Sequence, residues 1–167
     1  MLKPQDIVVL LKIKSLNGKW IYKDLAQSLG MSSSEVHAAL KRCEESSLYI
    51  NRSRRVLKSA LKEFIIHGLR YSFPAKPGGL VKGIPTAHSA DPLKSLLVVN
   101  DDDIYVWPSS DGQVRGQAIK PLHHSVPQAT QNDPLLYQLL SLVDGLRVGK
   151  ARDSELAIQE LDKIMSL

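Results

Sequence analysis

The stretch YKDLAQSLGMSSSEVHAALKRCEESSLY, residues 22–49, decides the fold of the N-terminal part of the chain. Its apolar spacing predicts a short helix over residues 22–29, and Gly30 follows at the position where helices commonly end. Ser32 and Glu35 have the Ser-x-x-Glu spacing of a capping box, in which each side chain satisfies a backbone N–H of the other residue. The pattern therefore predicts two helices joined by a tight turn, with the second over roughly 33–45.

The two predicted helices have an apolar side and a polar side. The apolar side packs the helices together, and it consists of Leu25, Ala26, Leu29, Val36 and Leu40. The second helix then presents short or polar side chains that suit base edges and phosphates in a major groove, namely Ser33, Ser34, His37, Ala38 and Lys41. This arrangement predicts a DNA-binding helix-turn-helix. The alternative is a helical hairpin that binds a protein and no DNA.

Residues 22–49 resemble the helix-turn-helix of MarR-like winged-helix regulators, in which Leu-Ala-x-x-Leu-Gly-hydrophobic-Ser precedes the recognition helix. The resemblance implies that the DNA-facing positions are Ser32, Ser33, Ser34, His37 and Lys41. Two later stretches, FIIHGLRYSFPAKPGGLVKGIPTAHSA and LVDGLRVGKARDSELA, resemble bacterial proteins described as MarR-like regulators of unknown ligand. That second resemblance implies no activity.

A basic loop, residues 51–55, follows the predicted helix-turn-helix. Its Arg52, Arg54 and Arg55 are candidate contacts to DNA phosphates or the minor groove, and a solvated basic loop is the alternative. The loop departs from the MarR-like pattern because an amphipathic helix is predicted to begin near Val56. We therefore expect little room for the returning strand of a wing.

The rest of the chain predicts an α+β protein. A first helix is expected over residues 5–16 and a fourth over 56–68. Strands are expected at 96–99, 104–107 and 113–119, the last two joined as a hairpin through Asp111-Gly112. Helices over 134–148 and 151–165 complete the chain, the first capped by Asp133. We expect two domains, a winged helix-turn-helix over 1–70 and an α+β dimerisation, sensing or partner-binding domain over 71–167.

Charge is distributed unevenly between these two parts. Residues 1–70 carry 13 Lys/Arg against 6 Asp/Glu, a net charge of +7. Residues 71–167 carry 9 Lys/Arg against 11 Asp/Glu, a net charge of −2. A basic half beside a nearly neutral remainder is typical of a protein that meets a polyanion through one part, although a solvated basic surface has the same composition.

Signatures of enzymes, cofactor sites and membrane proteins are missing from the sequence. The glycines around Lys82 lack phosphate-loop spacing, and His67, His88 and His123 lack Cys/His pairing at zinc spacing. The His123-His124-Ser125 run has no positioned acid. We therefore expect no catalysis, cofactor or metal. Cys43 is the single cysteine, and no apolar run approaches the length of a membrane span, so a cytoplasmic protein without a signal peptide is expected.

These observations predict a bacterial transcriptional regulator that binds duplex DNA through the helix at 33–45. The alternative is a winged-helix protein-interaction module, such as an antitoxin or an adaptor for an acidic protein partner. A homodimer is expected, with the leucine-rich helices at 133–148 and 151–166 as its interface, because such regulators usually bind two half-sites. The second part is expected to receive a signal or a protein partner. Its Tyr105 and Trp107 share one strand face, where they line either a pocket or a core.

Overall fold

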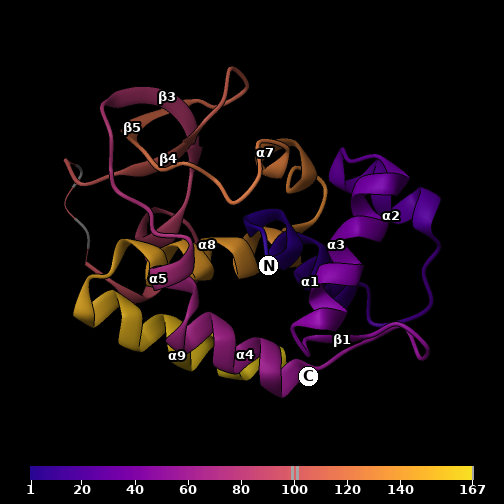
Figure 1. Cartoon of the computed structure of the whole chain (residues 1–167). Helices are drawn as coiled ribbons and strands as arrows, with labels where there is room; N and C mark the ends of the chain where they lie inside the picture. The colour runs from indigo at the N-terminus through magenta and orange to yellow at the C-terminus, as the bar shows by residue number, and fades with distance from the viewer. Residues whose placement is uncertain (99, 101, 167) are drawn as a thin grey trace.

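The computed structural model describes residues 1–98, 100 and 102–166 and shows an α+β fold (Figure 1). The N-terminal elements are α1 (Pro4–Leu16), α2 (Tyr22–Leu29), α3 (Ser33–Glu45), β1 (Tyr49–Ile50), β2 (Arg55–Val56), α4 (Lys58–His67) and α5 (Leu69–Ser72). They are followed by β3 (Leu80–Pro85), the 3-10 helix η1 (Ala87–Ser89), α6 (Leu93–Leu96), β4 (Tyr105–Pro108), β5 (Val114–Ala118), α7 (Val126–Ala129), α8 (Pro134–Val148) and α9 (Ala151–Met165). No described helix has the length and apolarity needed to cross a membrane.

The turn between α2 and α3 forms as its sequence predicts. Gly30 has a left-handed backbone with φ of 63°, and its N–H donates to carbonyl groups at the end of α2. The Ser32 hydroxyl accepts from the Glu35 N–H at 3.1 Å, and the Glu35 carboxylate accepts from the Ser32 N–H at 2.8 Å. The predicted capping box is confirmed, as are the bounds of α2 and α3.

The basic loop is part of a short antiparallel hairpin, which corrects the expectation of little room for a returning strand. Tyr49 pairs with Val56, and Ile50 pairs with Arg55. Room exists because α4 begins at Lys58 and not near Val56. The side chains of Tyr49 and Val56 are buried, so the inner face of this hairpin belongs to the core.

Strands β3, β4 and β5 close into a small barrel, and this corrects the predicted hairpin. Strand β3 is antiparallel to both neighbours, whereas β4 and β5 are parallel to each other. The 109–113 connection crosses β3 so closely that a Cβ on Gly112 would lie 2.2 Å from the Gly83 carbonyl group. Asp111-Gly112 therefore serves a close backbone crossing, not a two-residue hairpin turn. The strand expected at 96–99 does not form at residues 96–98: Leu96 ends α6, and the next two residues belong to no strand. Val99 lies outside the described residues.

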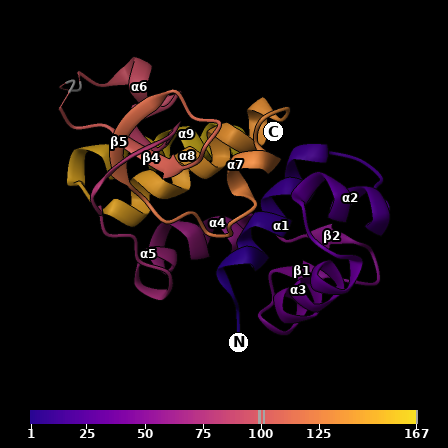
Figure 2. The ribbon, with the colours of Figure 1, turned by 90° about the horizontal axis from the view of Figure 1, so that it is seen from above.

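Helix α1 lies at the centre of the molecule because its apolar residues occupy every side of the helix. All residues from Asp6 to Lys14 are buried. The helix packs against α3 on one side and α8 on another, as Figure 2 shows from above. One continuous cluster of buried side chains extends from Ile7 to Met165, so residues on both sides of position 70 share a core.

The leucines of α8 belong to this shared core, which corrects the predicted dimer interface. Leu136, Leu139, Leu140, Val143 and Leu146 are each at most 3% exposed. Helix α8 packs on α1, η1 and α9 of the same chain, and α9 also packs on α4. These leucines are therefore not available to a second copy of the chain.

The two strand aromatics are also core residues. Tyr105 packs with Ala87 and Ile119 in a second small cluster, and Trp107 is 1% exposed in the main core. The Trp107 indole N–H donates to the Asp144 carboxylate at 2.6 Å. Neither ring is left to line an open pocket.

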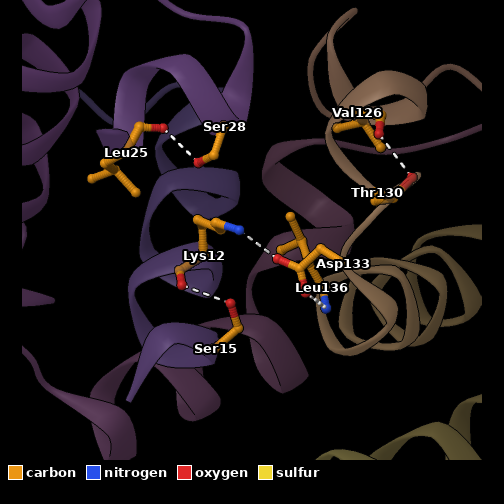
Figure 3. A network of polar contacts seen from close by, with 8 residues as sticks. All are labelled: Lys12, Ser15, Leu25, Ser28, Val126, Thr130, Asp133 and Leu136. Carbon is orange, nitrogen blue, oxygen red and sulfur yellow. Dashed lines mark hydrogen bonds and ion pairs between the residues drawn. The ribbon is translucent and has the colours of Figure 1, made fainter. Parts of the chain in front are cut away.

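An ion pair crosses the seam between the N-terminal helices and α8 (Figure 3). The Lys12 ammonium lies 2.6 Å from Oδ2 of Asp133, while Oδ1 of Asp133 accepts from the Leu136 N–H and caps α8. One carboxylate therefore both starts α8, as its sequence predicts, and ties it to α1. Beside this pair, a polar cleft of about 320 Å³ separates the end of α2 from the residues around α7.

Candidate nucleic-acid interface

Helix α3 has one buried face and one exposed face. Val36, Ala39, Leu40 and Cys43 are buried against the core. The side chains that the sequence predicts to face outward are all exposed: Ser33, Ser34, His37, Ala38 and Lys41. No described residue forms a side-chain hydrogen bond or ion pair with Ser33, Ser34 or Lys41. These three side chains are therefore available to a ligand.

Two residues that the sequence did not single out fix α3 to α1. The Arg42 guanidinium donates to both carboxylate oxygens of Asp6, at 2.8 and 2.7 Å. Asp6 is fully buried, and its hydrogen bond raises the pKa of Arg42 from the ordinary arginine value. A bidentate pair between these residues sets how α3 sits on α1. It also removes Arg42 from the set of cations that a polyanion could meet.

Next to Arg42, the Cys43 thiol is inert. Burial raises its pKa to about 12, with the nearby Asp6 carboxylate acting in the same direction. The thiolate is the reactive form of cysteine, so this side chain acts as a small apolar core residue.

His37 is exposed but already has an aromatic partner. Its ring stacks on Tyr22 with centroids 3.6 Å apart and an interplanar angle of 10°. The Tyr22 ring in turn packs against the Trp20 ring in a T-shaped arrangement, with ring centroids 5.0 Å apart. One face of the His37 ring is therefore covered, and its position relative to α2 is set by stacking.

Arg54 is held on the same aromatic rings. Its guanidinium carbon lies 5.1 Å from the ring centroids of both Trp20 and Tyr22, and its Nη1 donates to the Trp20 carbonyl oxygen at 3.3 Å. We call His37, Tyr22, Trp20 and Arg54 the aromatic stack. It connects α3, the start of α2 and the hairpin, so Arg54 holds the hairpin in place through cation–π contacts.

A basic groove of about 520 Å³ lies between the α1–α2 connection and the turn of the hairpin. The residues that line it are Gly18, Lys19, Trp20, Ile21, Arg52, Ser53 and Arg54. The described lining includes three cations and no carboxylate, and Lys19 and Arg52 form no ion pair with a described residue. We call it the basic groove. Lys19 and Trp20 were missed at the sequence level, where only their place after the Asn17-Gly18 turn could have marked them.

Arg55 does not line the basic groove. It lies on the exposed face of the hairpin and lines a separate groove with Lys58, at the junction of β2 and α4. The three arginines of residues 51–55 therefore do not form one cluster. Arg52 and Arg54 lie in the turn and border the basic groove, whereas Arg55 is the first residue of β2 and lines the other groove.

Folding also redistributes the charge of the N-terminal part. Ion pairs occupy Arg42 with Asp6, Lys12 with Asp133 and Lys62 with Asp162. The exposed side of α3 includes Glu44 and Glu45 as well as Lys41. Positive charge that is open to a ligand is therefore concentrated at the hairpin and the basic groove more than on α3 itself.

The histidine run shows no catalytic geometry. Nδ1 of His123 accepts from the Ser125 hydroxyl at 2.7 Å. Burial lowers the pKa of His123, and the nearby His124 lowers it further through charge repulsion. No carboxylate hydrogen-bonds to this pair within the described part of the chain. A search of the same residues finds no group of three metal-ligating side chains.

Comparison of the chain with family models, with curated proteins and with solved structures finds no match.

Proposed function

We propose that the chain is a bacterial DNA-binding transcriptional regulator, and that residues 4–56 form a winged helix-turn-helix. The observation that carries this proposal is the juxtaposition of the open face of α3 with the carboxylate-free basic groove. A helix with short exposed side chains can enter a major groove, and cations beside it can meet the flanking phosphates. A cytoplasmic location accords with this role.

We assign different tasks to the eight candidate DNA residues, according to the contacts that each side chain already makes. Ser33, Ser34 and Lys41 are open and are assigned to bases and nearby phosphates. The Ser32 oxygen already accepts the capping hydrogen bond of α3. Arg52, at the turn of the hairpin, is assigned to a phosphate, and Arg55 to a more distant one. His37 and Arg54 are assigned to positioning, because stacking and cation–π contacts already occupy them.

Lys41 provides the direct test. A duplex selected by the protein from a random-sequence pool serves as the probe. Replacing Lys41 with alanine is expected to cost about 1–3 kcal/mol of binding free energy if the side chain contacts a base, and to relax specificity at one position. Titration of wild type and variant measures the loss, and Lys94→Ala, an exposed lysine in α6, is the matched control. Equal affinities for wild type and Lys41→Ala, or no selectable duplex, would contradict the proposal.

Arg52 and Arg54 are expected to respond differently to salt. Removing a phosphate contact lowers the slope of log affinity against log salt by about one unit. We expect this for Arg52→Ala. For Arg54→Ala we expect weaker binding with the slope unchanged, and an altered Trp20 emission, because that guanidinium lies on the indole. Salt titrations of both variants, with Arg115→Ala on β5 as control, separate the two roles. Equal slope changes would place both arginines on phosphates.

A protein-interaction module is the second candidate, and the glutamates beside Lys41 favour it. Glu44 and Glu45 are exposed on α3 and would repel phosphates. The basic groove would then take an acidic segment of a protein partner, as in an antitoxin or adaptor. Failure of the random-pool selection, together with a native fold, is the result expected from this candidate.

Assembly as a homodimer stays a prediction, motivated by the two half-sites that such regulators usually bind. With the leucines of α8 buried, an interface would have to use other surfaces.

A further inference from the structure

The polar cleft between α2 and α7 lies outside the proposed interface. Its volume of about 320 Å³ is at the lower end of the range for small-molecule sites, about 300–1,000 Å³. Helix α1 provides Lys12 to its lining, α2 provides Gln27 and Ser28, and α7 provides Gln128. The connection from α7 to α8 completes the lining. The cleft therefore has walls from both the N-terminal and the C-terminal parts of the chain.

The two walls are already fixed to each other. Figure 3 shows Lys12 of α1 reaching across the seam to Asp133, where the ammonium lies 2.6 Å from Oδ2. At the end of α2 the backbone closely approaches α7, because a Cβ on Gly30 would lie 3.3 Å from Cβ of Ser125 and 4.0 Å from Oε1 of Gln128. The cleft is therefore formed before any ligand enters it.

The Lys12 ammonium has hydrogen-bond donors to spare. The Lys12 side chain is 10% exposed, and its ammonium donates one hydrogen bond, to Asp133. An ammonium has three N–H donors, and the other two have no acceptor among the described residues. Leaving a buried donor unpaired costs free energy. An oxygen atom of a molecule in the cleft can accept from them.

Carboxamides provide most of the remaining polar groups of the cleft. Four exposed side chains carry them, and none forms a side-chain hydrogen bond with another described residue: Gln27, Gln128, Gln131 and Asn132. Each carboxamide both donates and accepts hydrogen bonds. The Ser28 hydroxyl donates to the Leu25 carbonyl oxygen at 2.8 Å, and its oxygen can still accept. An apolar ligand would remove water from these groups and replace none of its hydrogen bonds.

The described lining is neutral as a whole. Its charged residues are Lys12 and Asp133, which neutralise each other. An ion therefore gains no net attraction from the cleft. A carboxylate ligand would offer only acceptors and an ammonium ligand only donors, whereas a hydroxyl group offers both. An uncharged molecule with several hydroxyl groups thus matches the lining best.

We propose that this cleft binds an uncharged polyhydroxyl molecule of monosaccharide size, which forms hydrogen bonds with Lys12 and with the carboxamides of both walls. The bound molecule joins α2 to the segment between α7 and α8. Only the folded chain brings these walls together, so the ligand stabilises the folded state. This proposal does not rest on DNA binding, because it concerns a different surface of the molecule.

The test uses the full-length chain with D-glucose, D-ribose and myo-inositol as probes. We expect at least one of them to lower the unfolding equilibrium constant about tenfold when the free ligand is at about ten times its dissociation constant. Urea unfolding measures this effect. Amide spectra of the folded chain should show saturable shifts of the side-chain signals of Gln27 and Gln128. A sugar phosphate and glucosamine serve as the charged comparisons.

Gln27→Leu and Gln128→Leu identify the site. Both positions are exposed, so the variants are expected to fold. Each should weaken binding about two- to tenfold, the contribution of one net hydrogen bond, and the double variant should weaken it further. Gln113→Leu, at an exposed glutamine in the connection between β4 and β5, is the matched control and should bind as wild type does. Sugars also stabilise proteins through exclusion from their surface, but these substitutions leave that effect unchanged.

Three results would overturn the proposal. They are no saturable shift with any uncharged probe, equal binding by wild type and the double variant, and tighter binding of the sugar phosphate or of glucosamine than of the uncharged sugars.

Discussion

Replacing Asp144 with alanine is expected to lower the free energy of unfolding by about 3–5 kcal/mol, the usual cost of removing one partner from a buried ion pair. Asp144 is 2% exposed, and its carboxylate accepts from the Thr86 hydroxyl at 2.7 Å, the Trp107 indole at 2.6 Å and the Arg147 guanidinium at 2.8 Å. The variant would bury an unpaired arginine and two unsatisfied donors. A loss of this size is a large fraction of the whole stability of a typical domain, about 5–15 kcal/mol.

Urea unfolding at neutral pH, followed by circular dichroism, measures this effect. Asp162→Ala is the control, because the Lys62–Asp162 pair is exposed and such pairs contribute about 0–1 kcal/mol. The Arg147 guanidinium also donates to the carbonyl oxygens of Phe73 and Lys120, which extends the network to both ends of the barrel segment. A loss for Asp144→Ala no greater than for the control would show that this network does not stabilise the fold.

The isolated fragment of residues 1–70 is expected to lack a cooperative unfolding transition. Helix α1 is buried on every side, and α8 provides one of those sides. In the fragment, α4 would also lose its packing against α9, and Lys12 would lose its ion pair with Asp133. Each large aliphatic side chain returned to water forfeits about 1.5–3 kcal/mol, so exposing several exceeds the stability of a typical domain.

Thermal unfolding and the dispersion of amide signals in the fragment, compared with the full chain, provide the measurement. Adding the separate 71–167 fragment should restore order if the shared core is the cause. A fragment that unfolds cooperatively by itself would instead support two independent domains divided near residue 70. It would also allow DNA binding to be measured without the second part.

The features that the sequence predicted correctly are those decided within a few residues. The capping box at Ser32 and Glu35, the left-handed Gly30 and the Asp133 cap of α8 each depend on hydrogen bonds between close neighbours. Helical periodicity likewise predicted the bounds of α2, α3 and α9. The open side chains of α3 followed from the same period of 3.6 residues.

The features that the sequence missed depend on which distant segments meet. The leucines of α8 were predicted to join two copies, because an apolar stripe has the same pattern whether another chain or α1 covers it. Asp111-Gly112 was predicted as a hairpin turn, because the crossing over Gly83 involves a residue far along the chain.

The candidate interface likewise combines features that neighbouring residues determine with features that depend on distant segments. The sequence by itself determined that residues 22–49 form two capped helices with Ser33, Ser34, His37 and Lys41 outward, because local hydrogen bonding and helical periodicity suffice for that. Only the tertiary structure decided that the Arg54 guanidinium packs on the Trp20 ring while Arg52 lines the basic groove without an ion pair to a described residue. It also decided that Arg42 forms an ion pair with Asp6. The physical reason is that the availability of a charge depends on its partners in space, and these come from segments that folding brings together.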